Sequence, residues 1–266
     1  MTQRERSPDY VLSLERGLSV IKAFTPRHPA MTLTQVAERT GLTRPAARRF
    51  LLTLESLGYV RQEGRLFSLR PRVLELGHAF LASVHPWDAA FPIMEKLSDS
   101  VEENCLAGVL DETDVICVAR TTRRLVTVAV YVGGRVPAFA SSMGRAILAN
   151  LGEEELEGFF AAARLKPVTS HTLTDISVLR EELAKVREQG WSIVEQELEE
   201  GLMSVSVPVY GASQRAVAAL NVSAHGNRLT RRDVEERILP PLLECGREVS
   251  LIFGSRPDPL REPDQD

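Results

Sequence analysis

Residues 34–72, TQVAERTGLTRPAARRFLLTLESLGYVRQEGRLFSLRPR, join two helix-forming segments, a tight turn and two strand-forming segments without interruption. The Thr34 hydroxyl is placed to cap a short first helix, which reaches Thr40 and stops at the following glycine. Thr43 repeats this capping chemistry, and Pro45 falls in the first turn of a second helix, where a missing N–H is tolerated. The stretch therefore predicts two helices separated by a tight turn.

The second helix has an apolar face and a basic face. Its apolar residues recur at spacings of four, four and three, which is the period of a buried helical stripe: Ala46, Phe50, Leu54 and Leu57. The opposite face, near the helix N-terminus, holds Thr43, Arg44, Ala47 and Arg48, with Arg49 to one side. A recognition helix meets base edges and phosphates in the major groove of DNA with such a face. A solvated amphipathic helix has the same pattern, so this helix alone leaves both interpretations open.

A β-ribbon is expected directly after the second helix. Residues 59–69 follow a helix-ending glycine and read as two short strands around the Glu63-Gly64 turn, with Arg65 projecting from a wing. This order of elements predicts a winged helix-turn-helix that binds double-stranded DNA. The candidate DNA-binding residues are Thr34, Thr43, Arg44, Pro45, Ala47, Arg48, Arg49 and Arg65.

The charges of the chain are divided between its two parts. Residues 1–77 contain 13 Lys and Arg against 7 Asp and Glu, a net charge of +6. The remaining residues contain 19 against 29, a net charge of −10, and the two parts together give the −4 of the whole chain. The basic part is therefore the part suited to a polyanion.

The length of 266 residues and the hydrophobic content of 44% suit two domains that each bury a core. We expect a DNA-binding domain at 10–70, a linker helix at 71–85, a second domain at 86–254 and flexible tails at 1–9 and 255–266. No apolar run resembles a signal peptide or a membrane span, so we expect a cytoplasmic protein without a membrane partner.

The cysteines and histidines give no sign of a metal or disulfide framework. Cys105, Cys117 and Cys245 lie far apart in apolar segments and are expected to be reduced core thiols. The five histidines lack the short spacings of a local metal site, although a site assembled from distant residues stays open. We expect no cofactor.

The remaining periodic segments outline the rest of the fold. A first helix at 13–24 is expected to pack through Leu14, Leu18 and Ile21, and the 71–85 helix has an apolar stripe that suits a domain interface or a dimer contact. In the second domain, helices are expected at 90–101, 142–151, 153–162, 175–189 and 230–253, the last kinked at Pro240-Pro241. Strands are expected at 105–110, 114–120, 125–131, 191–196, 203–210 and 216–223. This order favours an α+β sheet flanked by helices.

The motifs of common enzyme classes are missing from the sequence. There is no G-x-S-x-G elbow, no G-x-x-x-x-G-K-[ST] phosphate loop and no H-E-x-x-H pair, and Ser142 is followed three residues later by Arg145 instead of lysine. The cluster of Glu195, Glu197, Glu199 and Glu200 reads as solvated surface beside a turn. We therefore expect that the protein is not an enzyme. Two alternatives to a DNA-binding protein are an enzyme whose basic module only docks partners and a pure oligomerisation adaptor.

Several short motifs, in order along the chain, carry a family resemblance. They are residues 14–18 (LERGL), 33–37 (LTQVA), 40–42 (TGL), 57–60 (LGYV) and 140–146 (ASSMGRA). On these the chain resembles the isocitrate-lyase-regulator (IclR) family of bacterial transcription factors over almost its entire length. Residues 46–54 and 67–77 resemble the branch that controls the β-ketoadipate pathway of aromatic-acid catabolism.

The resemblance implies a winged helix-turn-helix followed by a GAF-like or profilin-like sensor domain with a mixed sheet, in a homodimer or homotetramer. It further implies double-stranded operator DNA as a partner, with RNA polymerase as a further candidate. The implied effector is a small carboxylate such as β-ketoadipate, protocatechuate or 4-hydroxybenzoate. Control of another pathway, such as glyoxylate or sugar-acid use, is the alternative.

The resemblance also nominates effector-binding residues, beginning with the backbone amides of Ser142 and Met143 and their neighbour Ser141. Ser204 stands where the family frequently has cysteine, and it shares a strand face with Ser206. Asn221 and Ser223 share a face of the next strand. From the residues alone, Ser141 is an ordinary helix cap and both strand pairs face solvent as readily as a cavity. Two arginines, Arg120 and Arg135, suit either a bound carboxylate or a surface ion pair.

Overall fold

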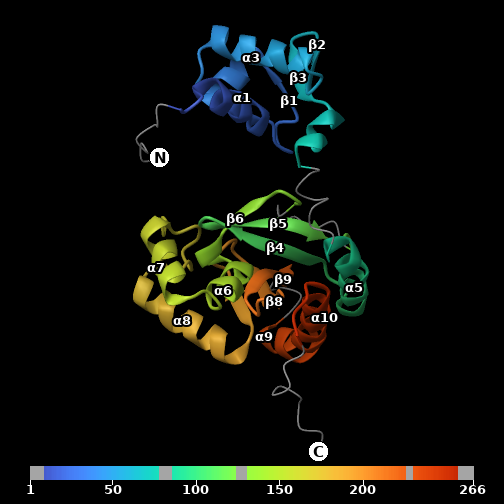
Figure 1. The fold of residues 1–266 in the computed structure, drawn as a ribbon, viewed down its shortest axis with the longest axis vertical. Helices are drawn as coiled ribbons and strands as arrows, with labels where there is room; N and C mark the ends of the chain where they lie inside the picture. The colour runs from blue at the N-terminus through green and yellow to red at the C-terminus, as the bar shows by residue number, and fades with distance from the viewer. Residues whose placement is uncertain (1–8, 78–85, 124–130, 226–229, 257–266) are drawn as a thin grey trace, which may run out of the picture. The chain divides into compact units, whose positions relative to one another are not determined.

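The structure is a computed structural model that describes residues 9–77, 86–123, 131–225 and 230–256. The chain divides into two compact units, Met1–Ser83 and Val84–Asp266, which are described separately here as unit 1 and unit 2 (Figure 1). Part of the predicted linker helix, the N-terminal tail and most of the C-terminal tail lie outside the described residues. No helix in the described part of the chain is long and apolar enough to span a bilayer.

Unit 1 is a winged helix-turn-helix, as predicted. Its helices are α1 (Leu12–Ala23), α2 (Leu33–Thr40) and α3 (Arg44–Ser56). Its antiparallel sheet has the order β1-β3-β2, with strands β1 (Ala30–Thr32), β2 (Val60–Glu63) and β3 (Leu66–Leu69). β1 was not predicted, because three residues are too few to show a period. A 3₁₀ turn, η1 (Pro71–Leu74), follows the wing.

The cap of α2 lies two residues before the predicted one. Thr32, and not Thr34, is the N-cap, and it forms a capping box in which its hydroxyl accepts the N–H of Gln35 at 3.4 Å. The Gln35 side chain in turn accepts the Thr32 N–H at 2.8 Å. Thr34 lies inside the first helical turn. The prediction missed the cap because a hydroxyl stands at both positions, and only Thr32 has a glutamine three residues later.

The buried stripe of α3 is also displaced from the predicted one. The residues that pack into the core are Ala47, Leu51 and Leu54, whereas Leu57 is 51% exposed and Phe50 is half-buried. Ala47 is fully buried, so its predicted place on the DNA-facing side is wrong. Two apolar rows at helical spacing run side by side along this helix, and the packing of α3 against its neighbours selects one of them.

The first helix packs through its C-terminal half. Val20 is fully buried and Ala23 and Phe24 are nearly so, whereas Leu14 is 62% and Leu18 47% exposed. The predicted core role of these two leucines is therefore wrong within unit 1. They form an apolar surface on α1.

Unit 2 is built on a six-stranded sheet with the order β6-β5-β4-β9-β8-β7, and every pairing in the described part is antiparallel. The strands are β4 (Cys105–Asp111), β5 (Asp114–Arg120), β6 (Arg135–Pro137), β7 (Ser192–Glu195), β8 (Leu202–Tyr210) and β9 (Ala216–His225). The predicted β4–β5 hairpin is confirmed, with Asp111 opposite Asp114. The predicted strand at 125–131 lies almost wholly outside the described residues, and β6 was not predicted.

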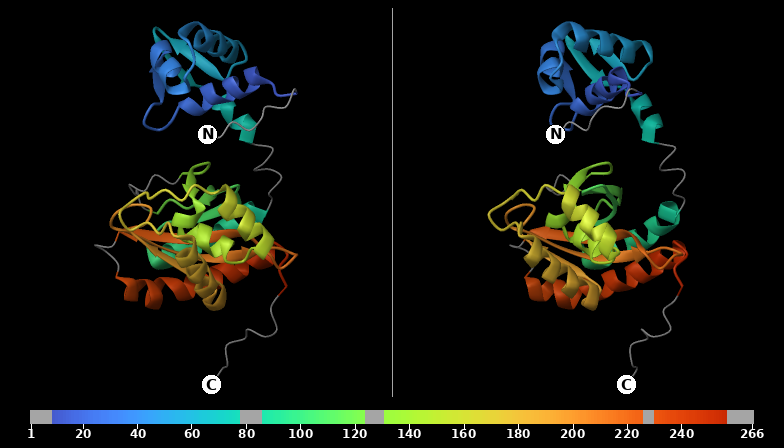
Figure 2. Two further views of the ribbon diagram at one scale, coloured as in Figure 1. Left: turned by 90° about the vertical axis from the view of Figure 1, so that its left-hand side faces the viewer. Right: turned by 60° about the vertical axis from the view of Figure 1, so that its left-hand side comes forward.

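Helices cover both faces of this sheet, as expected for the α+β class. α5 (Pro86–Val101) and α10 (Leu239–Ile252) bury one core, and α6 (Ser142–Leu148), α7 (Glu153–Ala162) and α8 (Ile176–Gln189) bury the other. Figure 2 shows α10 on one side of the sheet and the α6–α7 pair on the other. α5 begins at Pro86, the proline predicted to end the linker helix, and residues 78–85 of that predicted helix lie outside the described residues.

The C-terminal helix is interrupted where the proline pair predicted a kink. Thr230 caps α9 (Arg231–Asp233) as expected, and a π-helical turn (Val234–Ile238) then leads into α10. The Leu239 N–H bonds to the carbonyl of Val234. Because Pro240 and Pro241 carry no N–H, the regular ladder of hydrogen bonds cannot continue across them.

We expect Thr32→Ala to lower the stability of unit 1 by about 1 kcal/mol, because the Gln35 N–H loses its acceptor at the start of α2. Amide hydrogen exchange of α2 in the full-length chain measures this change. Thr34→Ala, the matched control, is expected to stay within about 0.5 kcal/mol of the wild type. Equal losses in the two variants are the result that contradicts the assigned cap.

Candidate functional site

The start of α3 presents an exposed basic surface on unit 1. The Thr43 side chain accepts the Ala46 N–H at 3.4 Å and fixes the first turn, as predicted. The four arginines of the predicted set are all exposed on α3 and the wing: Arg44, Arg48, Arg49 and Arg65. In the described part of the chain these four arginines form no ion pair, so no carboxylate described there neutralises their charges.

Unit 2 contains a pocket that is partly open to solvent. All six predicted effector residues line it: Ser141, Ser142, Met143, Ser204, Asn221 and Ser223. The other lining residues are Asn104, Leu106, Arg120, Val136, Leu198 and Leu202. Apart from Arg120, none of this second set was predicted, and for its four apolar members the reason is that an apolar residue facing a pocket has the same pattern as one facing a core.

A hydrogen-bonded cluster of serines and one asparagine forms the polar floor of this pocket. Ser142 Oγ lies 3.0 Å from Ser204 Oγ and 2.8 Å from Ser206 Oγ. The Asn221 amide donates to Ser142 Oγ at 3.0 Å and to Ser206 Oγ at 3.1 Å, and Ser223 donates to Asn221 Oδ1 at 2.6 Å. The sequence had left open whether the polar pairs on these two strands face solvent or a cavity. The solvent-facing alternative is wrong, since Ser206 is fully buried and Asn221 is 3% exposed.

The first turn of α6 packs closely against the preceding 3₁₀ turn, η2 (Ala138–Ala140). Ser141 is the N-cap, as its residue type predicted, and its hydroxyl accepts the Gly144 N–H at 3.1 Å. A Cβ placed on Gly144 would lie 2.0 Å from the carbonyl oxygen of Ala138. Glycine is therefore required there, directly after Ser142 and Met143, the two helix residues that line the pocket.

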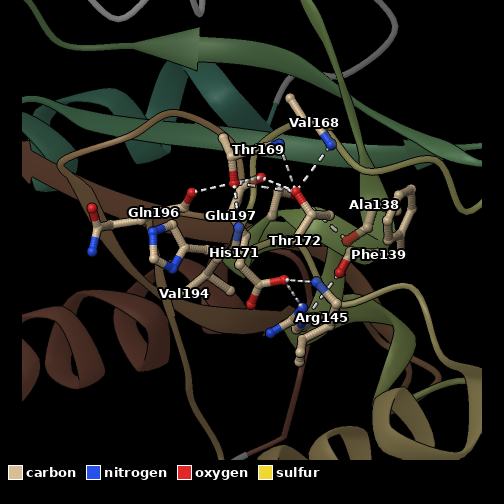
Figure 3. A network of polar contacts seen from close by, with 12 residues as sticks. Ala138, Phe139, Arg145, Val168, Thr169, His171, Thr172, Val194, Gln196 and Glu197 are labelled. Carbon is tan, nitrogen blue, oxygen red and sulfur yellow. Dashed lines mark hydrogen bonds and ion pairs between the residues drawn. The ribbon is translucent and has the colours of Figure 1, made fainter.

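A buried ion pair joins α6 to the segment after β7 (Figure 3). Arg145 on α6 and Glu197 after β7 are 2% and 7% exposed, and their side chains approach to 2.6 Å. Arg145 Nε also donates to the Phe139 carbonyl at 2.9 Å. Glu197 was predicted to be solvated surface together with its acidic neighbours, and that prediction is wrong.

The same glutamate also anchors the segment between α7 and α8. Its Oε2 accepts the Leu173 N–H at 2.8 Å, and its carbonyl accepts the Thr172 hydroxyl at 2.7 Å. Thr169 donates to the carbonyl of Gln196 at 2.7 Å. Figure 3 shows these groups converging on the chain between β7 and β8, so one network joins three segments that are distant in sequence.

The two arginines considered for a carboxylate have different environments. Arg135 is bound to Asp111 at 2.7 Å and to Asp114 at 3.1 Å at the surface of the β4–β5 hairpin. It therefore serves as a surface ion-pair partner. Arg120, at the end of β5, lines the pocket.

The three cysteines are free and buried, as expected of core thiols. Burial raises the pKa of Cys117 to about 11, although the charge of Arg120 acts in the opposite direction. A hydrogen bond with Cys245 and burial raise the pKa of Cys105 well above its ordinary value. These two thiols stay protonated at neutral pH, which does not suit a nucleophile. In the described residues no group of three or more metal-ligating side chains is placed to hold an ion.

We expect Arg145→Met to destabilise unit 2 by about 3–5 kcal/mol, because it leaves the Glu197 carboxylate buried without its cation. Both tryptophans, Trp87 and Trp191, lie in unit 2, so tryptophan fluorescence during urea unfolding measures this unit. Arg180→Met, the matched control, breaks exposed ion pairs to Glu153 and Glu157 and is expected to cost less than about 1 kcal/mol. Equal losses in the two variants contradict the role given to the buried pair.

Comparisons with known proteins place both units in one family. Residues 13–64 match the IclR helix-turn-helix domain, and residues 78–251 match the C-terminal domain of the bacterial transcriptional regulator IclR. The chain is 45% identical to the Pca regulon regulatory protein of Pseudomonas putida over 250 residues, which cover 93% of this chain and 86% of that protein. It is 34% identical to the p-hydroxybenzoate hydroxylase transcriptional activator of Acinetobacter baylyi, with 92% of each chain covered.

Solved structures agree with this assignment. A transcriptional regulator from Rhodococcus sp. RHA1 has a TM-score of 0.81 and 41% sequence identity, with 92% of this chain and 98% of that chain covered. The inducer-binding domain of the transcription factor PobR from Acinetobacter has a TM-score of 0.58 and 28% identity, with 61% of this chain and 96% of that chain covered. These relatives are transcriptional regulators and not enzymes. The chain belongs to the IclR family of bacterial transcriptional regulators.

Proposed function

We propose that this protein controls genes for the breakdown of an aromatic acid, binding operator DNA through unit 1 and a small carboxylate through unit 2. One observation carries the proposal. A single chain combines an exposed arginine surface on a helix-turn-helix with a pocket whose floor is polar and whose lining includes a guanidinium.

The DNA-binding part of the proposal rests on α3 and the wing. Arg44 and Arg48 lie one helical turn apart near the N-terminus of α3, the end from which a recognition helix contacts base edges. Thr43, Pro45 and Arg49 lie beside them, Arg65 lies at the wing turn, and Thr34 lies in the first turn of α2. Ala47 is buried and takes no direct part, so seven of the eight predicted residues remain candidates.

The effector part rests on the pocket and on the relatives. The name of the Pseudomonas putida relative refers to the Pca regulon, and that of the Acinetobacter baylyi relative to p-hydroxybenzoate hydroxylase. The PobR domain was solved as a double mutant in complex with 3-hydroxybenzoic acid. The chemistry of this lining, with apolar walls, a serine-asparagine floor and one arginine, suits an acid of this kind.

The remaining parts of the proposal concern assembly. A dimer, or a dimer of dimers, reads two half-sites separated by about one helical turn of DNA or a multiple of it. The exposed leucines of α1 suit such self-association. Effector binding changes the DNA affinity through the segment at 71–84. RNA polymerase is a further proposed partner, and the cytoplasm, where the operator lies, is the proposed location.

We expect the double variant Arg44→Ala/Arg48→Ala to lose DNA affinity by about 1–3 kcal/mol for each arginine that reads a base edge. Its affinity should also depend less steeply on salt, because fewer counterions are released. The measurement is fluorescence anisotropy with a duplex that the wild-type chain has selected from random-sequence DNA.

The matched control is Arg232→Ala/Arg237→Ala, which removes two exposed positive charges from unit 2. This control is expected to bind DNA like the wild type. Equal loss in the two double variants means that net charge, and not the α3 surface, determines binding.

We expect at least one of protocatechuate, 4-hydroxybenzoate and β-ketoadipate to bind the full-length chain in calorimetry and to change its DNA affinity. Ser142→Ala is expected to abolish or strongly weaken that binding, because it removes one buried hydrogen-bond partner from each of Asn221 and Ser206 in the pocket floor. Ser177→Ala, at the exposed start of α8, is the control. A chain whose DNA affinity responds to none of the three acids does not have the proposed function.

A further inference from the structure

The 163–175 segment connects α7 to α8 and contains neither helix nor strand. Connections of about a dozen residues without secondary structure are uncommon in compact domains, and an ordered one is usually functional. The structure describes the whole segment, and its residues do not line the pocket. Two of its threonines, Thr169 and Thr172, nevertheless bond to the chain at 196–201 that joins β7 to β8 (Figure 3).

The hydroxyl of Thr172 is the centre of this attachment. It donates its hydrogen to the carbonyl of Glu197 at 2.7 Å. It also accepts the N–H groups of Val168 and Thr169, at 3.0 and 2.9 Å. Since a hydroxyl has one hydrogen and two lone pairs, its whole hydrogen-bonding capacity is in use. Thr172 therefore joins a turn of the 163–175 segment to one carbonyl of the β7–β8 connection.

Thr169 holds the neighbouring carbonyl in a similar way. Its hydroxyl donates to the carbonyl of Gln196 at 2.7 Å and accepts the His171 N–H at 3.1 Å. Gln196 has a φ of 60°, in the left-handed region that residues with side chains rarely adopt. Such a conformation persists only where its surroundings hold it. The Thr169 hydroxyl supplies part of that hold, and the Gln196 side chain adds to it by accepting the Gly201 N–H at 3.1 Å.

The two carbonyls control the backbone that leads into the pocket wall. They belong to consecutive peptide groups, and the second of these joins Glu197 to Leu198. Because a peptide group is planar, holding its carbonyl also orients the Cα atom of the next residue. Leu198 lines the pocket, whereas the Glu197 side chain is bound to Arg145. The ion pair thus fixes the Glu197 side chain, and the threonines fix the backbone from which Leu198 extends.

We propose that Thr169 and Thr172 are positioning residues for the pocket of unit 2, which act by holding Leu198 in its wall. This inference rests on the proposed function and adds a segment outside the pocket that controls the affinity of the site. A wall that is already in place when a ligand arrives needs no ordering, so more of the contact energy remains as affinity. A wall released from the threonines is ordered only by the ligand, and this weakens binding.

The experiment is a double-mutant cycle between Thr172 and Leu198. Calorimetric titration of the full-length chain with protocatechuate, 4-hydroxybenzoate and β-ketoadipate measures binding. Thr172→Val removes the hydroxyl, Thr172→Ser keeps it, and Leu198→Ala removes the wall contact itself. The matched control is Ser250→Ala on α10, which packs in the other core of unit 2. It removes a buried hydroxyl that accepts the Tyr210 N–H at 3.0 Å.

Thr172→Val is expected to weaken binding about three- to tenfold, as for one lost hydrogen bond, while Thr172→Ser and Ser250→Ala bind like the wild type. Leu198→Ala is expected to weaken binding about tenfold, because apolar contact area is lost. The double variant Thr172→Val/Leu198→Ala is expected to bind within about a factor of two of Leu198→Ala alone. The two losses do not add, because the hydroxyl then has no wall side chain to position.

Hydrogen exchange of the free full-length chain supplies a readout that needs no ligand. The amides of Gln196, Gly201 and Leu202 donate the hydrogen bonds that close the β7–β8 connection. In Thr172→Val they are expected to exchange about three- to tenfold faster than in the wild type. In Thr172→Ser and Ser250→Ala they are expected to keep the wild-type rate.

The inference is overturned, with the proposed function intact, if Thr172→Val binds the acids like the wild type or if the losses add in full in the double variant. An equal loss in Thr172→Ser or Ser250→Ala overturns it too, because the cause is then a general loss of stability. Unchanged exchange in Thr172→Val has the same meaning. Failure of the proposed function is distinct, since the wild-type DNA affinity then responds to no acid, and a wild type that binds none of the three overturns both.

Discussion

The buried ion pair between Arg145 and Glu197 is the interaction on which the pocket of unit 2 depends. Removing a guanidinium and a carboxylate from water costs several kcal/mol for each ion, and the cost is offset only where both groups have further hydrogen bonds. Here Arg145 also binds the Phe139 carbonyl, and Glu197 also accepts the Leu173 N–H. The pair therefore tolerates little displacement of either partner.

The position of this pair in the chain connects it to the pocket. Arg145 follows Ser142 by three residues on α6, and Glu197 immediately precedes Leu198. The ion pair therefore also holds two residues of the pocket lining in place, the polar Ser142 and the apolar Leu198. The hydroxyl cluster around Asn221 then joins α6 to β8 and β9, so that the floor of the pocket and its supporting helix form one hydrogen-bonded structure.

The sequence was sufficient for most of the helices and strands and for about half of the pocket lining, but not for β1 and β6 or for choices between neighbouring residues. The α3 helix and the wing follow from periodicity and turn chemistry, yet Ala46 and Ala47 both fit a buried stripe and only packing distinguishes them. The same holds for Thr32 and Thr34 at the start of α2. Ser204, Asn221 and Ser223 were predicted because polar residues alternate on two strands. The family resemblance nominated Ser141, Ser142 and Met143. Glu197 was missed because its partner lies 52 residues away, beyond any local pattern.

The division of the pocket into a hydrogen-bonded floor and apolar walls has a consequence for how such regulators change their ligand during evolution. Removing one member of the floor leaves its buried partners unsatisfied, at a cost of about 1–3 kcal/mol, which is a large part of the stability of a typical domain. Exchanges among apolar residues of similar volume, at positions such as Val136, Leu198 and Leu202, cost less than about 1.5 kcal/mol. New ligand preferences are therefore accessible through the walls, by steps that leave both the fold and the hydrogen-bonded floor intact.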